Sequence, residues 1–207
     1  MKGRPMQFDL SLQPVRTWQR EGSAVFCRVR EQWGEFSNMH GGYGYEDQGL
    51  FWRSTEHQFQ AGAFGHLPDH QERIRNAPNA MVAKQVAYER LAERRPDWQK
   101  LNLAMMAYVL SRKAGVKDFA TILALSGDQS IVELSMRDEF WGAKPRGNTL
   151  VGRNMLGHLL MQLRAGARMD ELPGDIAFGS PAPVARRETS SRQSDFFGTI
   201  RALDRSR

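Results

Sequence analysis

Two neighbouring segments of the chain concentrate acids, aromatic rings and small polar side chains that could bind and cleave a polar ligand. The first is Gly34-Glu35-Phe36-Ser37-Asn38, and the second runs from Trp52 to Gln60. Aromatic rings offer flat faces for stacking, hydroxyl and amide groups form hydrogen bonds, and two acids could be held close together. The side chains that could do this are Glu35, Phe36, Ser37, Asn38, Trp52 and Glu56.

Glu56 directly follows Ser54-Thr55, a sequence typical of a helix N-cap. At that end of a helix the macrodipole favours the charged carboxylate. A base, a nucleophile or an acid that grips a hydroxyl would fit this position. On these residues alone, a capping acid followed by a buried aromatic face is the better explanation.

Lys84 lies in a segment with helical apolar spacing that starts at Asn79. A lysine on the polar face of such a helix is usually solvated. A partly desolvated amine with a lowered pKa could instead attack an anomeric carbon or form an imine.

The segment from Val132 to Gly142 places Glu133, Asp138 and Trp141 within a few residues of one another. Two explanations fit this segment about equally well: capping with core packing, or a site that combines acids with a stacking ring. The second is favoured by the acid inside an apolar stretch, which is costly unless it is paired.

A glycine-punctuated run, Gly147 to Gly157, ends at a predicted helix N-terminus that could bind a phosphate. It departs from the G-x-G-x-x-G pattern. The sequence also has no H-E-x-x-H metal motif, no P-loop and no G-x-S-x-G nucleophile elbow. We therefore expect metal-free chemistry by carboxylates or lysine, with no cofactor.

These groups must be positioned by a chain of 207 residues, long enough for one domain with a proper core. A net charge of +6 favours an anionic partner, although the arginines are scattered along the sequence. The single Cys27 excludes an internal disulfide and a multi-cysteine metal site. With neither a signal peptide nor a membrane-length apolar run in the sequence, we expect a cytoplasmic protein with no membrane partner.

The apolar spacing predicts a mainly α-helical class with a small β element. Helices are expected over 56–64, 68–76, 79–91, 96–115, 117–126 and 152–167, and strands over 23–29, 50–52 and 131–134. We expect residues 1–22 to be a loosely ordered lead-in, residues 23–172 to form the domain, and residues 173–207 to be a mostly disordered tail.

Taken in order, these segments resemble the NADAR family, also called YbiA-like, from about Val25 to Arg164. The matching pieces are G-E-F-S-N (34–38), W-x-x-x-E-H-x-F-Q (52–60), A-x-x-x-K (80–84), R-P-D-W (95–98), S-G-D-x-x-I-V-E-x-S (126–135), D-x-F-W-G (138–142) and G-x-N-x-L-G-x-L-L-M-x-L-R (152–164). The chain departs from the family at Ala87-Tyr88, where a glycine-arginine pair is usual, and at Lys144, which replaces the glycine usual soon after Trp141-Gly142. Both departures could alter the substrate pocket more than the reaction.

The resemblance implies an N-glycosidase. One implied substrate is ADP-ribose on the guanine amino group of nucleic acid, which would make the protein an antitoxin partner of a DNA ADP-ribosyltransferase toxin. The other is a ribosylamino-pyrimidine phosphate of riboflavin synthesis. A module that binds ADP-ribose or NAD without cutting is a further alternative. Both substrates join ribose C1 to an exocyclic amine, so one mechanism would serve both.

The resemblance also implies roles for individual residues. We expect Lys84 to be a covalent amine, with Glu56, Glu133 and Asp138 gripping ribose hydroxyls and moving protons. Alternatively, a carboxylate activates water against an oxocarbenium-like carbon. Stacking on a base is expected from Trp52, Trp98 or Trp141, the last followed by Gly142 in the binding segment. Contact with a phosphate is expected from Arg153 with Asn154.

Overall fold

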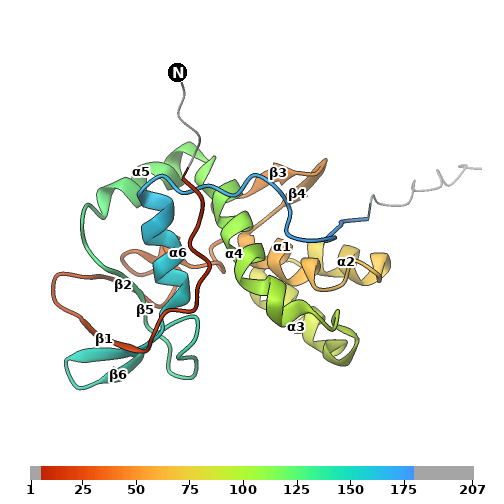
Figure 1. Ribbon diagram of the computed structural model, residues 1–207. Coiled ribbons are helices and arrows are strands. Elements are labelled where there is room, and N and C mark those ends of the chain that lie inside the picture. The colour runs from red at the N-terminus through yellow and green to blue at the C-terminus, as the bar shows by residue number, and fades with distance from the viewer. Residues whose placement is uncertain (1–5, 180–207) are drawn as a thin grey trace, which may run out of the picture.

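The computed structural model describes residues 6–179 (Figure 1). The helices in this range are α1 (Thr55–Gly62), α2 (Pro68–Arg75), α3 (Ala80–Glu89), α4 (Trp98–Ala114), α5 (Lys117–Leu125) and α6 (Met155–Arg164), with short 3-10 helices η1 (Gly34–Phe36) and η2 (Leu91–Glu93). The strands are β1 (Arg16–Gln19), β2 (Ala24–Phe26), β3 (Tyr45–Asp47), β4 (Leu50–Trp52), β5 (Ile131–Glu133), β6 (Lys144–Arg146) and β7 (Thr149–Gly152).

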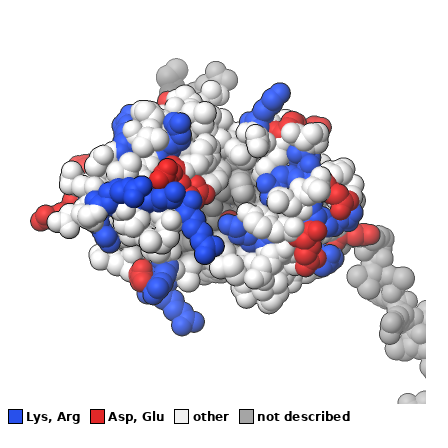
Figure 2. All heavy atoms as spheres, turned by 90° about the horizontal axis from the view of Figure 1, so that it is seen from below, with Lys and Arg blue, Asp and Glu red and all other residues white. Residues whose placement is uncertain are grey.

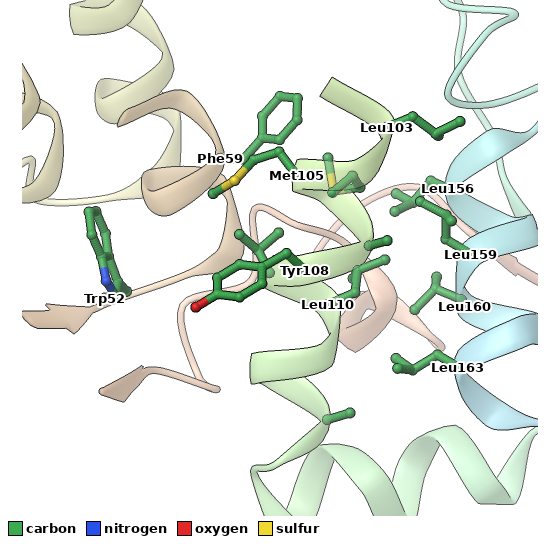
Figure 3. Close-up of a cluster of buried hydrophobic side chains, with 14 of the residues drawn as sticks. Trp52, Phe59, Leu103, Met105, Tyr108, Leu110, Leu156, Leu159, Leu160 and Leu163 are labelled. Carbon is green, nitrogen blue, oxygen red and sulfur yellow. The ribbon is translucent and has the colours of Figure 1, made fainter. Parts of the chain in front are cut away.

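The long helix α4 forms the centre of the fold. It packs against α6 and α5 on one side and against α1 on the other, and α2 and α3 pack on α1 (Figure 1). Leucines of α6 point toward α4 in Figure 3, and Leu159, Leu160 and Leu163 are buried. Because α4 is covered from both sides, Met105 to Leu110 are buried all round the helix, which is the expected pattern for a central core helix.

Three small sheets surround the helices. Strand β1 pairs antiparallel with β7, which pairs with β6; β2 pairs parallel with β5; and β3 and β4 form a hairpin. The expected helices are all present in the described residues, whereas the β structure is distributed over three sheets rather than one small element.

Two segments have more structure than we expected. The lead-in contains β1, whose Arg16 pairs with Gly152 far along the chain, and Phe8 is buried in the core. The glycine-punctuated run begins in the turn of the β6–β7 hairpin, with Gly147 at a φ of 57°, and continues through β7 into the first turn of α6. A positive φ favours glycine, so the turn geometry accounts for Gly147 and no bound phosphate is needed to explain it.

The first residues of the predicted tail also pack on the domain. Ile176 is buried, Asp175 forms an ion pair with Arg95, and the ring of Phe178 lies 4.9 Å from that of Trp52. Residues 1–5 of the lead-in and residues 180–207 of the tail lie outside the described residues. Among the helices described, none is long and apolar enough to cross a membrane.

Candidate active site

A cleft of about 840 Å³ lies between the helices α1, α3 and α4 on one side and the segment 133–141 on the other. In Figure 2 the molecule is seen from below, with lysine and arginine on both sides of a hollow and acids at its edge. The predicted site residues that line the cleft include the four predicted catalytic residues, Glu56, Lys84, Glu133 and Asp138, together with Asn38. Residues from four distant parts of the sequence therefore meet at one site.

Glu56 lies in the first turn of α1 with only 5% of its surface exposed. The amide Nε2 of Gln60 donates to its Oε1 at 2.8 Å, and its backbone N–H donates to the carbonyl of Asn38. Burial raises the pKa of Glu56, while the Gln60 hydrogen bond and the charge of Lys84 oppose the rise. Desolvation is thus the largest effect on the pKa of this carboxyl group.

Glu133 ends strand β5 and points its carboxyl group into the same cleft. Burial raises its pKa to about 7, with repulsion from Asp138 and Glu56 adding to the shift and Lys84 opposing it. Gly142 approaches this residue closely, because a Cβ there would lie 2.8 Å from the carbonyl oxygen of Glu133. A carboxyl group with this pKa can hold or release a proton near neutral pH.

Lys84 lies on α3, half-buried, on the wall of the cleft that faces Glu133. Its charge lowers the pKa of both Glu56 and Glu133. Its Nζ is 5.7 Å from the centre of the Tyr88 ring. Among the described residues no carboxylate lies within salt-bridge distance of this amine, so it faces the cleft unpaired.

Asp138 has a structural contact as well as a place on the cleft. Its Oδ1 accepts from the backbone N–H groups of Phe140 and Trp141 at 2.8 and 2.9 Å, which holds the loop in its turn. The capping role that we weighed for this segment is thus present for one of its two oxygens. The loop places Trp141 against Phe59, with ring centres 5.9 Å apart.

Aromatic rings line one end of the cleft. The ring centres of Phe59 and Trp98 are 5.1 Å apart, so Trp98 and Trp141 both pack on the Phe59 ring. Trp98 is only 4% exposed, whereas Trp141 is half-buried. Of the two tryptophans, Trp141 has the larger free surface for a stacked base.

The segment 34–38 is divided between the cleft and the core. Ser37 and Asn38 line the cleft, and the Oδ1 of Asn38 is buried with no partner among the described residues. Phe36 is fully buried between Phe26 and Phe119, and Glu35 does not line the cleft. Asn38 therefore belongs to the cleft lining, while Phe36 belongs to the core.

Four other predicted site residues lie away from the cleft lining. Trp52 is 1% exposed and packs on Phe178, and Gly142 is buried beneath Glu133. Arg153 donates to the carbonyl of Gln13 at 2.5 Å. Asn154 is fully buried with its side chain bonded to β5. The expected stacking by Trp52 and phosphate contact by Arg153 and Asn154 are therefore replaced by structural contacts.

The cleft also contains residues that sequence reasoning did not single out. Gln60 lies four residues after Glu56, a spacing that puts both on one helix face and could have indicated the pair. Tyr88 belongs to one of the two departures from the family pattern, and it does line the cleft. No local signal marked the others, which are Arg94, Gln99, Asn102 and Arg137. Within residues 6–179, no three His, Cys, Asp or Glu side chains are grouped so as to hold a metal ion.

Comparison with known proteins gives one family. The NADAR domain model matches residues 25–168. N-glycosidase YbiA of Escherichia coli is 30% identical over 141 residues, covering 67% of this chain and 84% of the relative. An N-glycosidase of Nostoc punctiforme is 31% identical over 151 residues, covering 69% of this chain and 91% of that protein.

Two further comparisons bear on substrate and fold. A riboflavin biosynthesis protein of Vibrio vulnificus is 32% identical over 117 residues, which are 56% of this chain and only 31% of that protein. The NMR structure of E. coli YbiA matches with a TM-score of 0.58 and 28% identity, covering 71% of this chain and 89% of the other. The fold described above is thus similar to that of a protein named for cleavage of N-glycosidic bonds.

Proposed function

The chain belongs to the NADAR family, and on that premise we propose that its cleft hydrolyses the bond between C1 of ADP-ribose and the exocyclic amino group of guanine in nucleic acid. The relatives named N-glycosidases support the reaction class. In this proposal the protein reverses DNA ADP-ribosylation and acts as the antitoxin to a DNA ADP-ribosyltransferase.

One observation carries the proposal: an unpaired amine and two carboxyl groups with raised pKa values share one cleft. Lys84 supplies the amine, and Glu56 and Glu133 supply the acids. A site of this composition provides a nucleophile and a proton donor within one enclosed volume.

The first route uses Lys84 as a covalent catalyst. An exocyclic N-glycoside opens to an iminium at C1 when a carboxyl group of the cleft protonates the ring oxygen. Lys84 gives a proton to the resulting carboxylate, and its amine adds to C1. Glu133 donates a proton to the departing guanine nitrogen as the C1–N bond breaks and takes one from the added Lys84 nitrogen, leaving a protonated imine between C1 and Lys84. Water then adds to C1, the C1–Nζ bond breaks, and the sugar is released with the amine regenerated.

The second route needs no covalent intermediate. A carboxylate takes a proton from water, which attacks an oxocarbenium-like C1 while a protonated carboxyl assists the departing amine, as in glycoside hydrolysis. Asn38 and Asp138 would bind ribose hydroxyls in either route, since both line the cleft.

Charge supports a nucleic-acid substrate. The chain carries a net charge of +6, and the cleft rim contains Arg94, Arg137 and Lys144. Cations around a site attract a polyanion more strongly than a single phosphate. A ribosylamino-pyrimidine phosphate is the second candidate, because a relative named for riboflavin biosynthesis matches part of this chain.

The test is hydrolysis of a guanine-ADP-ribosylated DNA oligonucleotide, with a thymidine-linked oligonucleotide as the control and products resolved by mass. Release from the guanine substrate alone supports the proposal. Turnover of a ribosylamino-pyrimidine phosphate instead moves the protein to the second candidate. Tight binding of ADP-ribose with no turnover of either substrate identifies a binding module.

The two routes are separated by borohydride, which reduces an imine to a stable amine. The covalent route predicts a sugar adduct on Lys84 in the wild-type protein and loss of turnover in Lys84→Ala. Lys117→Ala is the matched control, because Lys117 is exposed at the start of α5. Near-normal turnover in Lys84→Ala with no trapped adduct would leave the water route.

A further inference from the structure

Arg94 differs from the other arginines on its side of the fold. It follows η2 and precedes α4, and it lines the cleft. Every other arginine between residues 73 and 112 has a carboxylate partner, in the pairs Arg73–Glu89, Arg75–Glu72, Arg90–Glu93, Arg95–Asp97 and Arg112–Asp170. Within the described residues, Arg94 alone of this group has none, although acids are common nearby.

The Nε of Arg94 is also shielded from solvent and has no hydrogen-bond acceptor among residues 6–179. A guanidinium has five N–H donors and remains charged at all ordinary pH values. Leaving such a donor unsatisfied costs free energy, and in native proteins a ligand or a bound water usually supplies the acceptor. The two terminal nitrogens of Arg94 also have no hydrogen-bond acceptor among these residues, and unlike Nε they are not shielded, so a ligand in the cleft can reach them.

The surroundings of Arg94 favour an anion. Its guanidinium carbon lies 5.9 Å from the centre of the Tyr88 ring, and the Nζ of Lys84 lies 5.7 Å from the same point. Two unpaired cations thus flank one half-exposed aromatic ring on a single wall. The acids Glu56 and Glu133 lie in the same cleft, so an anionic group near Arg94 would be part of the molecule whose bond is cleaved.

We propose that Arg94 binds a phosphate group on the ribosyl side of the substrate, with Tyr88 holding the guanidinium in place. A planar guanidinium matches two phosphate oxygens with parallel hydrogen bonds, which the two terminal nitrogens of Arg94 can donate. The assignment rests on the proposed function, because both candidate substrates carry phosphate on the reacting ribose. It applies to either of them.

The test measures binding to the full chain and needs no turnover. Calorimetry with ribose 5-phosphate, and with ribose as the uncharged comparison, is carried out on the wild-type protein, Arg94→Gln and Arg73→Gln. Arg73 is the matched control because it is exposed and paired with Glu89 outside the cleft. We expect the wild type and Arg73→Gln to prefer the phosphorylated sugar by tenfold or more, and Arg94→Gln to lose that preference. An unchanged preference in Arg94→Gln overturns the assignment.

Further probes distinguish the source of the phosphate. ADP-ribose presents a pyrophosphate and a single-stranded DNA oligonucleotide presents phosphodiesters. The probe whose affinity falls tenfold in Arg94→Gln, with no such fall in Arg73→Gln, identifies the group that Arg94 binds. If no probe loses affinity, the assignment fails even where the hydrolysis assay succeeds; if the hydrolysis assay fails, the binding result still stands.

A measurement on the wild-type protein guards against a variant that does not fold. Phenylglyoxal modifies arginine side chains, and peptide mass analysis reports the extent of modification at residue 94. Protection of Arg94 by ribose 5-phosphate but not by ribose supports the phosphate site. Equal modification with and without the phosphorylated sugar contradicts it.

Discussion

The side chain of Asn154 holds the backbone of Glu133 in place: its Oδ1 accepts from the Glu133 N–H at 3.0 Å, and its Nδ2 donates to the Ile131 carbonyl at 2.8 Å. Asn154 is fully buried and has a φ of 50°, a conformation that asparagine tolerates better than most residues. The residue just before α6 therefore fixes the end of β5, where Glu133 lines the cleft.

The first prediction concerns this contact. Asn154→Gly keeps the left-handed backbone accessible but removes both hydrogen bonds, leaving a buried N–H and a buried carbonyl unsatisfied. We expect a loss of about 2–4 kcal/mol in the free energy of unfolding, measured by urea denaturation. Turnover should fall as well, because Glu133 loses its positioning contact. Wild-type stability in Asn154→Gly would show that these bonds contribute little.

The second prediction concerns the proton on Glu133. Its pKa is about 7, so the carboxyl group is protonated below that pH and charged above it. If it donates the proton to the leaving amine, kcat/KM should fall as the pH rises through about 7. Glu133→Gln should lose this limb and reduce turnover by about 10²–10⁴-fold. Glu46→Gln, at an exposed position on β3, is the control. A profile that rises through pH 7 would assign Glu133 the role of base instead.

The same pKa predicts that Glu133→Gln, which lowers turnover, raises the stability of the folded protein at high pH. The folded protein binds the Glu133 proton more tightly than the unfolded chain, whose carboxyl titrates near 4.5. Stability attributable to this group is therefore present below pH 4.5 and is lost as the pH rises to about 7. At pH 8 we expect Glu133→Gln to be more stable than the wild type by about 1 kcal/mol or more. Equal urea midpoints at pH 8 would contradict the desolvation of this carboxyl.

The helices could be predicted from sequence because their signals are local. Asn79 was expected to cap α3, and its side chain does accept from the Val82 N–H at 3.0 Å. Strands β1 and β7 were missed because their pairing joins residues such as Arg16 and Gly152 across most of the chain. Four-residue strands have little periodicity of their own, and only the partner defines them.

Some of the site residues could be predicted because their residue types are unusual within their local segments. Glu56, Lys84 and Glu133 stand out by residue type in their segments, and they do meet in one cleft. Whether a polar side chain faces the cleft or the core depends on tertiary packing. The inward turn of Asn154 and the bond from Arg153 to Gln13 follow from long-range contacts that spacing along the chain does not report.

The third prediction concerns the close contact of α6 with β5. A Cβ on Gly157 would lie 2.1 Å from the carbonyl oxygen of Ile131, and the backbone there cannot move without disturbing Asn154. We expect Gly157→Ala to lower the free energy of unfolding by about 1–3 kcal/mol. Gly41→Ala is the control, because the nearest atom to its Cβ would be 4.0 Å away. Equal thermal midpoints for the two variants would contradict this packing.

The fourth prediction concerns Lys113, which is 1% exposed beneath the segment 34–37. Its Nζ donates to the carbonyl oxygens of Glu35 and Ser37 at 2.6 and 3.0 Å and lies 4.4 Å from the centre of the Phe119 ring. Lys113→Met would leave the Glu35 carbonyl without a donor and the Ser37 carbonyl with the His40 N–H alone, and it would loosen the segment that carries Ser37 and Asn38 to the cleft. We expect weaker binding of substrate, seen as a higher KM, together with a loss of stability.

The pH dependence of this loss tests the burial of the amine directly. Burial lowers the pKa of Lys113 from 10.5 to about 7. Between these values the unfolded chain holds a proton that the folded protein has released, so the wild type gains stability as the pH rises, by at most about 1.4 kcal/mol per pH unit. Lys113→Met lacks the group and should lack this gain. Urea unfolding of both proteins at pH 7.0, 8.0 and 9.0 should therefore show a difference in free energy that widens with pH. A constant difference would mean that the amine keeps its proton throughout and remains charged beneath the cleft.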